Sequence, residues 1–127
     1  MHPDLDEARK HYWALRTLII CHLGGWKDEQ ALGQVITLCR AAKVAINDLE
    51  CHEKLDLARN YAGEVFSEDG HKKWDRASMT GVDFLRLQTL QVLDAFNNRL
   101  FAIEAMRRTE LRRGAQQVGK PDRRAQS

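Results

Sequence analysis

The sequence predicts an all-α fold, a small antiparallel helical bundle of three long helices. In three segments the apolar residues recur at alternating spacings of three and four, which places them on one face of a helix. The chain lacks sustained apolar–polar alternation and hairpin dipeptides, the patterns typical of β-strands. With 127 residues, 43% of them hydrophobic, it has the length and composition of one globular domain.

The first helix is expected to cover about residues 3–23. Its apolar stripe follows the three-four spacing from Leu5 to Trp26. Pro3 suits the first helical position, because its missing N–H would have no partner there. Gly24 and Gly25 predict the end of the helix, since glycine adopts the left-handed conformation without steric cost.

The second helix is expected to start after Asp28, a residue type that favours the N-cap position. Its apolar stripe runs to Leu49 and resumes out of phase at Leu55. A phase shift of this kind indicates a kink or a break. The second helix is therefore predicted to be bent or split near residues 50–54.

The third helix is expected to run from about 81 to 113. Thr80 and Asp83 resemble a capping box at its start, and Gly114 is expected to end it. Thr89 interrupts its apolar stripe. These expectations divide the chain into a helical bundle domain, 1–113, and a flexible basic tail, 114–127.

Two of the helices carry apolar residues beside their main stripes. These second rows are Trp13, Ile20 and Leu23 on the first helix, and Leu87, Leu90 and Phe101 on the third. A bundle this small needs one apolar face per helix, so either the core is wide enough to hold both rows or another molecule covers them. Covering by another molecule predicts a homodimer or a partner protein docked on these rows.

The segment between the second and third helices contains a candidate contact patch, formed by Lys72, Lys73, Trp74 and Arg76. Tryptophan and arginine are enriched at the centres of protein interfaces. Trp74 can equally stack on a single-stranded base, or fold back over the end of the bundle. Long loops in compact domains are more often functional than idle, which favours a contact with a partner.

Basic residues are concentrated near the C-terminus. Residues 107–127 carry a net charge of +5, so the first 106 residues carry −3 of the total of +2. The basic tail consists of Arg107, Arg108, Arg112, Arg113, Lys120, Arg123 and Arg124. Cations are favoured in the last turns of a helix, which accounts for its first four arginines. The tail offers nucleic acid or an acidic partner an electrostatic contact, whereas the acidic body is a poor surface for duplex DNA.

No metal, cofactor or catalytic site is predicted. Cys21-His22 and Cys51-His52 pair good zinc ligands, but adjacent helical residues point about 100° apart and rarely reach one ion. The sequence has no G-x-S-x-G, no glycine-rich phosphate loop and no H-E-x-x-H.

Arg16 and His22 are separated by five residues, and the polar Thr17 follows the arginine. This spacing resembles the R-x(4–6)-H motif of HEPN-type ribonucleases, which are helical bundles that dimerise. The resemblance implies that Arg16 and His22 form the catalytic pair of a ribonuclease.

The acidic start of the chain, the three cysteines and the absence of any long apolar run favour a cytoplasmic protein without membrane contact. We expect a non-enzymatic regulatory or adaptor protein that binds another protein. One form is an inhibitor that occupies a partner's helical or dimerisation surface. The alternative is a nucleic-acid-associated regulator that uses the basic tail and the Trp74 patch, and a HEPN-like ribonuclease is the third interpretation.

Overall fold

The structure is a computed structural model that describes residues 2–21, 28–66 and 81–118. These residues form helices and contain no strand, so the all-α class is confirmed. The helices are α1 (Pro3–Cys21), α2 (Glu29–Ala45), α3 (Leu49–Phe66) and α5 (Gly81–Val118). The described residues therefore contain four helices, whereas the sequence predicted three long ones.

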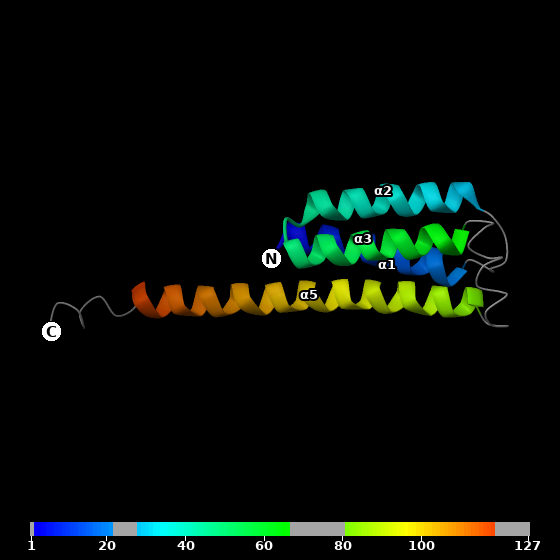
Figure 1. Cartoon of the computed structure of the whole chain (residues 1–127). Helices are drawn as coiled ribbons and strands as arrows, with labels where there is room; N and C mark the ends of the chain where they lie inside the picture. The colour runs from blue at the N-terminus through cyan, green and yellow to red at the C-terminus, as the bar shows by residue number, and fades with distance from the viewer. Residues whose placement is uncertain (1, 22–27, 67–80, 119–127) are drawn as a thin grey trace, which may run out of the picture.

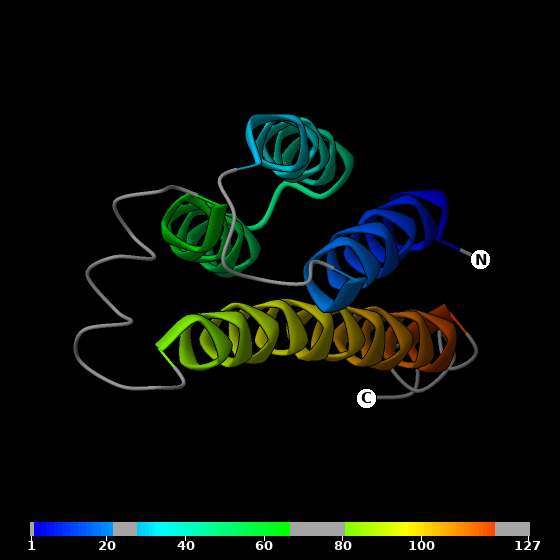
Figure 2. The ribbon, with the colours of Figure 1, turned by 90° about the vertical axis from the view of Figure 1, so that its right-hand side faces the viewer.

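The four helices form an antiparallel bundle (Figure 1). Each helix packs against two neighbours, in the pairs α1–α2, α2–α3, α3–α5 and α1–α5. Seen from the end, α2 lies opposite α5, and α1 and α3 lie between them (Figure 2). This is an up-down-up-down arrangement, in which consecutive helices run in opposite directions.

The expected break in the second helix is present, but it lies at residues 46–48 rather than 50–54. Ile46 has an extended backbone, with φ −130° and ψ 115°, which ends α2. Asp48 starts α3, because its carboxylate accepts a hydrogen bond of 3.0 Å from the Cys51 N–H. The ring of His52 lies 2.9 Å from the Ile46 carbonyl oxygen and donates to the end of α2. The polar residues of the connection thus fix the position of the break.

Asp28 joins the start of α2 to the end of α3. Its carboxylate accepts a hydrogen bond of 2.9 Å from the Ala31 N–H, which confirms it as the N-cap. Its own N–H donates to the carbonyl oxygen of Phe66, at 3.0 Å. α5 begins at Gly81, as expected, whereas the expected cap residue Thr80 and the expected stop at Gly24-Gly25 lie outside the described residues.

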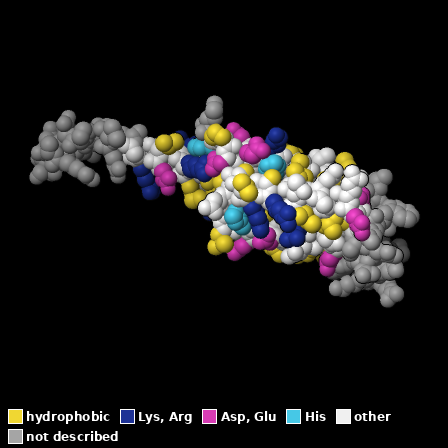
Figure 3. Space-filling view, turned by 90° about the horizontal axis from the view of Figure 1, so that it is seen from above, with side chains coloured by type: hydrophobic (Ala, Val, Ile, Leu, Met, Phe, Trp, Pro, Cys, Tyr) yellow, Lys and Arg dark blue, Asp and Glu magenta, His cyan; other side chains and the backbone are white. Residues whose placement is uncertain are grey.

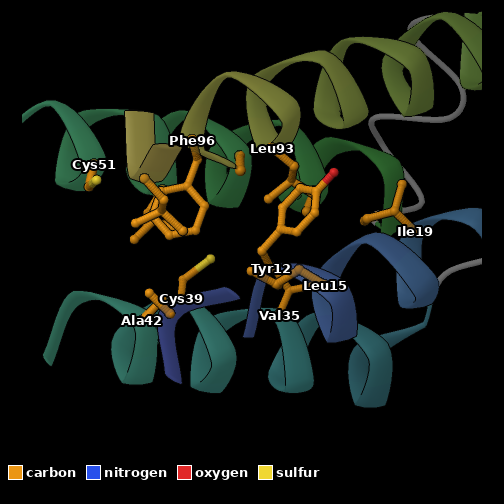
Figure 4. Close-up of a cluster of buried hydrophobic side chains, with 14 of the residues drawn as sticks. Tyr12, Leu15, Ile19, Val35, Cys39, Ala42, Cys51, Leu93 and Phe96 are labelled. Carbon is orange, nitrogen blue, oxygen red and sulfur yellow. The ribbon is translucent and has the colours of Figure 1, made fainter. Parts of the chain in front are cut away.

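The core is built from the main apolar stripes of all four helices (Figure 4). Its largest buried side chains include Leu5, Leu15, Ile19, Leu55, Phe66, Leu85, Leu93, Phe96 and Leu100. Thr89 is buried among them, and its hydroxyl donates to the Leu85 carbonyl oxygen at 2.8 Å, so the interruption in the stripe is satisfied within the helix. Leu49, expected on the stripe, is 76% exposed because α3 begins there in a new phase.

Gly114 does not end the last helix, since α5 continues to Val118. A single glycine in a helix costs only about 1 kcal/mol relative to alanine, and its neighbours are alanine, arginine and glutamine, which favour a helix. The C-terminal part of α5 extends past the ends of the other helices (Figure 1), and residues 108–114 are exposed. Arg112 and Arg113 lie in the last two turns of α5, as expected, but no arginine lies in the last turn. Arg107 and Arg108 lie too far from the helix end for the dipole to account for them.

Deleting residues 114–127 should leave the bundle intact. The side chains of 108–114 lie on the surface beyond the packed helices, so little apolar area is lost with the residues that follow. We expect the melting temperature, measured by circular dichroism, to change by less than about 3 °C. A larger decrease would show that the tail contributes to folding.

Candidate functional site

Four of the exposed large apolar side chains lie on the neighbouring helices α1 and α5, whereas others, such as Val44 on α2 and Leu57 on α3, lie elsewhere. We define the α1/α5 face as Trp13, Ile20, Leu87, Leu90 and Phe101. Trp13, Ile20, Leu87 and Phe101 are 58%, 46%, 52% and 51% exposed, and Leu90 is half-buried against the core. A spacing of seven residues separates Trp13 from Ile20, and one of fourteen separates Leu87 from Phe101, so each set lies on one side of its helix.

Arg9 joins the two helices at one end of the face. Its guanidinium group lies 3.3 Å from the carboxylate of Glu104. The same group lies 4.8 Å above the centre of the Phe101 ring, a cation–π contact. The hydrogen bond from Arg9 and its positive charge lower the pKa of Glu104. Both charges are thereby neutralised within the face.

Asp94 lies at the middle of the face. It accepts hydrogen bonds from the Tyr12 hydroxyl, at 2.6 Å, and from the Arg16 side chain, at 3.4 Å. Burial and the neighbouring Asp94 raise the pKa of Tyr12 to about 12. We call the Arg16–Asp94 contact the central ion pair. Trp13 packs edge-on against Tyr12, with the ring centres 5.0 Å apart, which supports its ring at the surface.

The face unites five of the residues that the sequence singled out on two separate helices. The wide-core alternative does not hold for Trp13, Ile20 or Phe101, because about half of each side chain is exposed. Leu23 lies outside the described residues, and so does the whole Trp74 patch, namely Lys72, Lys73, Trp74 and Arg76. The role assigned to that patch therefore stays a prediction.

The basic tail divides into residues with different surroundings. Arg107 forms a bidentate ion pair with Asp4, at 2.9 and 2.7 Å, and its hydrogen bonds lower the pKa of Asp4 to about 2. Arg108 lies 3.5 Å from Glu104. Arg112 and Arg113 are exposed on α5. The remaining basic residues, Lys120, Arg123 and Arg124, lie outside the described range.

On the side of the molecule on which α2 lies, the described residues form no continuous basic area (Figure 3). Basic and acidic side chains are interspersed there and on the protruding part of α5 (Figure 3). This agrees with the acidic net charge of residues 1–106. A mixed surface of this kind gives a polyanion no extended region of attraction.

A groove of about 820 Å³ between α1 and α2 was not expected from the sequence. Ala14, Leu18 and Cys21 line it from α1, and Gly33 and Leu38 are among the residues that line it from α2. None of the described residues that line it is charged. The small residues Ala14 and Gly33 are the only signal in the sequence, and small residues alone do not reveal which two helices will lie side by side.

The three cysteines differ in their exposure. Cys21 is exposed, whereas Cys39 and Cys51 are buried. Burial raises the pKa of Cys39 to about 11, and burial together with Asp48 raises that of Cys51 to about 12. Thiol reagents must reach the sulfur atom, and Cys21 is the exposed one of the three cysteines.

We therefore expect one fast-reacting thiol in the native protein. Titration with Ellman's reagent should release one equivalent rapidly, and three after unfolding in guanidinium chloride. Cys21→Ser should abolish the fast reaction without changing the melting temperature. Rapid reaction of two or three thiols in the native protein would contradict the burial of Cys39 and Cys51.

The described residues do not bring together a metal centre. No group of three or more histidine, cysteine, aspartate or glutamate side chains among them could hold a metal ion. Arg16, one member of the suggested ribonuclease pair, is engaged with Asp94. His22, the other member, lies outside the described ranges, so that interpretation is not tested.

Comparisons with known proteins returned no match, whether with family models, with curated proteins or with solved structures. Within the described part of the chain, no helix combines the length and the apolar character that crossing a membrane requires.

Proposed function

We propose that the protein is a non-enzymatic regulator or adaptor that binds another protein through its α1/α5 face. The observation that supports this most is the side-by-side exposure of four large apolar residues, Trp13, Ile20, Leu87 and Phe101. Single exposed apolar residues are ordinary, but several of them on two adjacent helices are typical of interaction sites. Tryptophan is also the residue most enriched at interface hot spots.

The charges on the face favour a protein partner with an apolar helical surface. Arg9 and Arg16 are each paired with a carboxylate from α5, so the face has no excess charge to attract a polyanion. The apolar rows run parallel to the helix axes, which suits a partner helix or helix pair. The protein would then act as an inhibitor, by occupying a surface that the partner uses for its own helical contacts.

Site-specific photo-cross-linking tests this function. A photoreactive amino acid in place of Phe101 should capture a partner in cells. The same amino acid in place of Val44, which is 87% exposed on α2, is the control. The captured protein, once purified, should bind the unmodified chain and bind Trp13→Ser at least tenfold more weakly.

The outcome separates the proposed face from other surfaces. Val44→Ser should bind the purified partner as tightly as the unmodified chain does. If Trp13→Ser and Phe101→Ser bind the partner normally, or if both cross-linkers capture the same proteins equally, the α1/α5 face is not the binding site and the proposal is wrong.

A second candidate is a nucleic-acid-associated regulator. The observation that favours it is the exposure of Arg108, Arg112 and Arg113 on the protruding part of α5. Phosphate contacts made by these arginines would weaken steeply with salt. Binding of a single-stranded oligonucleotide should then appear at low salt and decrease on Arg112→Ala/Arg113→Ala substitution. Absence of any mobility shift at low salt would remove this candidate.

A further inference from the structure

The charged side chains of the α1/α5 face are distributed so that a second copy of the same face can pair with them. The basic side chains, Arg9 and Arg16, both lie on α1, and their acidic partners, Glu104 and Asp94, both lie on α5. In both pairs α1 supplies the cation and α5 the carboxylate, although Asp6 on α1 also lies 3.9 Å from Arg9, and Arg108 on α5 lies 3.5 Å from Glu104. An identical face related by a twofold axis can present opposite charges to both helices.

The apolar side chains of α1 and α5 lie at matching positions along the helix axes, and we call the position of a residue along the axis its level. From the central ion pair, Trp13 and Phe101 lie toward one end of the face, and Ile20 and Leu87 toward the other. At about 1.5 Å per residue, Trp13 is within about 6 Å of the level of Phe101, and Ile20 is within about 5 Å of the level of Leu87. The two helices thus present the same order of apolar, charged and apolar positions.

Two symmetric arrangements of such a face exist, and the charges distinguish them. A twofold axis perpendicular to the helices places α1 on α1 and α5 on α5, so that Arg16 faces Arg16 and Asp94 faces Asp94. An axis parallel to the helices keeps every residue at its level and places α1 of one copy against α5 of the other. Arg16 of each copy then faces Asp94 of the other.

We propose that the protein forms a homodimer of the second kind, with α1 of each copy packed against α5 of the other. The four helices of the interface form a second bundle in which all neighbours are antiparallel. Trp13 of one copy packs near Phe101 of the other, and Ile20 near Leu87. The central ion pair of each copy then lies next to that of the other copy, with Arg16 opposite Asp94 in both directions.

The area of the face is sufficient for such a dimer. The exposed halves of two aromatic and two aliphatic side chains amount to roughly 400 Å² per copy, or about 800 Å² for both. Interfaces are about 60% apolar, so the total buried surface would be about 1,300 Å². This lies within the range of about 1,200–2,000 Å² that stable protein–protein interfaces bury.

This inference depends on the proposed function, because the same face serves both. The homodimer is the form in which the apolar rows are covered before a partner binds. A partner with a similar face would replace one copy, so homodimer and heterodimer would compete for a single surface.

Analytical ultracentrifugation of the full chain tests the association. The unmodified protein should be a dimer across a micromolar concentration series, and Trp13→Ser should raise the dissociation constant at least tenfold. Arg16→Asp and Asp94→Arg place like charges opposite each other and should each be monomeric alone. Mixed in equal amounts, these two variants should form a heterodimer, because each supplies the charge that the other lacks.

Cysteine cross-linking tests the arrangement. In a Cys21→Ser background, Thr17→Cys and Gln91→Cys place thiols on exposed positions of α1 and α5 at similar heights along the helix axes. Thr17 also lines the groove between α1 and α2, and it lies between Trp13 and Ile20 in the sequence of α1. A mixture of the two variants should form a disulfide between copies under mild oxidation, faster than either variant alone. Faster formation of the Thr17→Cys homodimer, or of the Gln91→Cys homodimer, would overturn the proposed symmetry.

The possible failures are distinguishable. A monomer at all concentrations would overturn the homodimer, yet leave partner binding by the α1/α5 face untouched, since that is measured with the purified partner. A dimer that Trp13→Ser does not weaken would place the interface elsewhere. Melting temperatures of all variants show whether each is folded, and Trp13→Ser, at an exposed position, keeps the test valid if a charge variant unfolds.

Discussion

Phe96→Ala should lower the free energy of unfolding by about 3–5 kcal/mol. Phe96 is fully buried at the centre of the bundle, where side chains from other helices surround its ring (Figure 4). Truncation to alanine removes most of this apolar area from the core and leaves a cavity that the packed helices can fill only in part. Urea denaturation followed by circular dichroism measures the change, provided that unfolding is two-state.

Phe101→Ala is the matched control, because it changes the same residue type five positions further along the same helix. Phe101 is half exposed, and its ring contacts the guanidinium group of Arg9. We expect a loss of no more than about 1 kcal/mol, from the cation–π contact and a small buried area. The same variant should weaken association through the α1/α5 face. Equal destabilisation by both substitutions would show that Phe101 belongs to the core.

The sequence predicts the core well because helical periodicity reports directly on burial. The stripe through Leu5, Tyr12 and Ile19 is buried as expected, and so is the face through Leu93 and Phe96. Side chains at three-four spacing must share one side of a helix, whatever the neighbouring helices are. This part of the fold required no knowledge of how the helices are arranged.

The helix ends were harder to predict, because they depend on local competition between propensity and capping. The break after α2 is determined by Asp48, which caps α3 and binds Arg99, and the second contact is invisible in the sequence. At Gly114 the expected stop is absent, since the neighbouring residues favour continuation of α5. The helix ends predicted wrongly are therefore those where a single residue, such as Asp48 or Gly114, can either end a helix or allow it to continue.

The candidate site was predicted only as two separate rows. Trp13 and Phe101 could be recognised as surplus apolar residues on their own helices, but not as parts of one surface. Their convergence requires α1 and α5 to be neighbours, which follows from the four-helix order that the break at residues 46–48 creates. The groove between α1 and α2 was missed for the same reason.

Asp48→Ala should lower the free energy of unfolding by about 2 kcal/mol. The carboxylate of Asp48 caps α3, and it also accepts two hydrogen bonds of 3.0 Å from the guanidinium group of Arg99. Loss of an N-cap costs about 1 kcal/mol, and loss of a charged hydrogen-bonded pair adds a comparable amount. Asp28→Ala is the control, because Asp28 caps α2 through Ala31. Its loss should cost about 1 kcal/mol, and equal losses would mean that the Arg99 pair contributes nothing.

The pH dependence tests the Asp48 carboxylate, which forms both the ion pair and the cap. Hydrogen bonds from Arg99 lower the pKa of Asp48 to about 2, from an ordinary value of 3.8. A lowered pKa in the folded state contributes stability that is fully present above the unfolded value and is lost as the pH falls toward 2. We therefore expect the free energy of unfolding to decrease between about pH 5 and pH 2. The decrease should be smaller in Asp48→Ala, with the pair between Asp4 and Arg107 accounting for part of what is left. An unchanged slope in Asp48→Ala would show that the Arg99 pair forms equally in the unfolded chain or not at all.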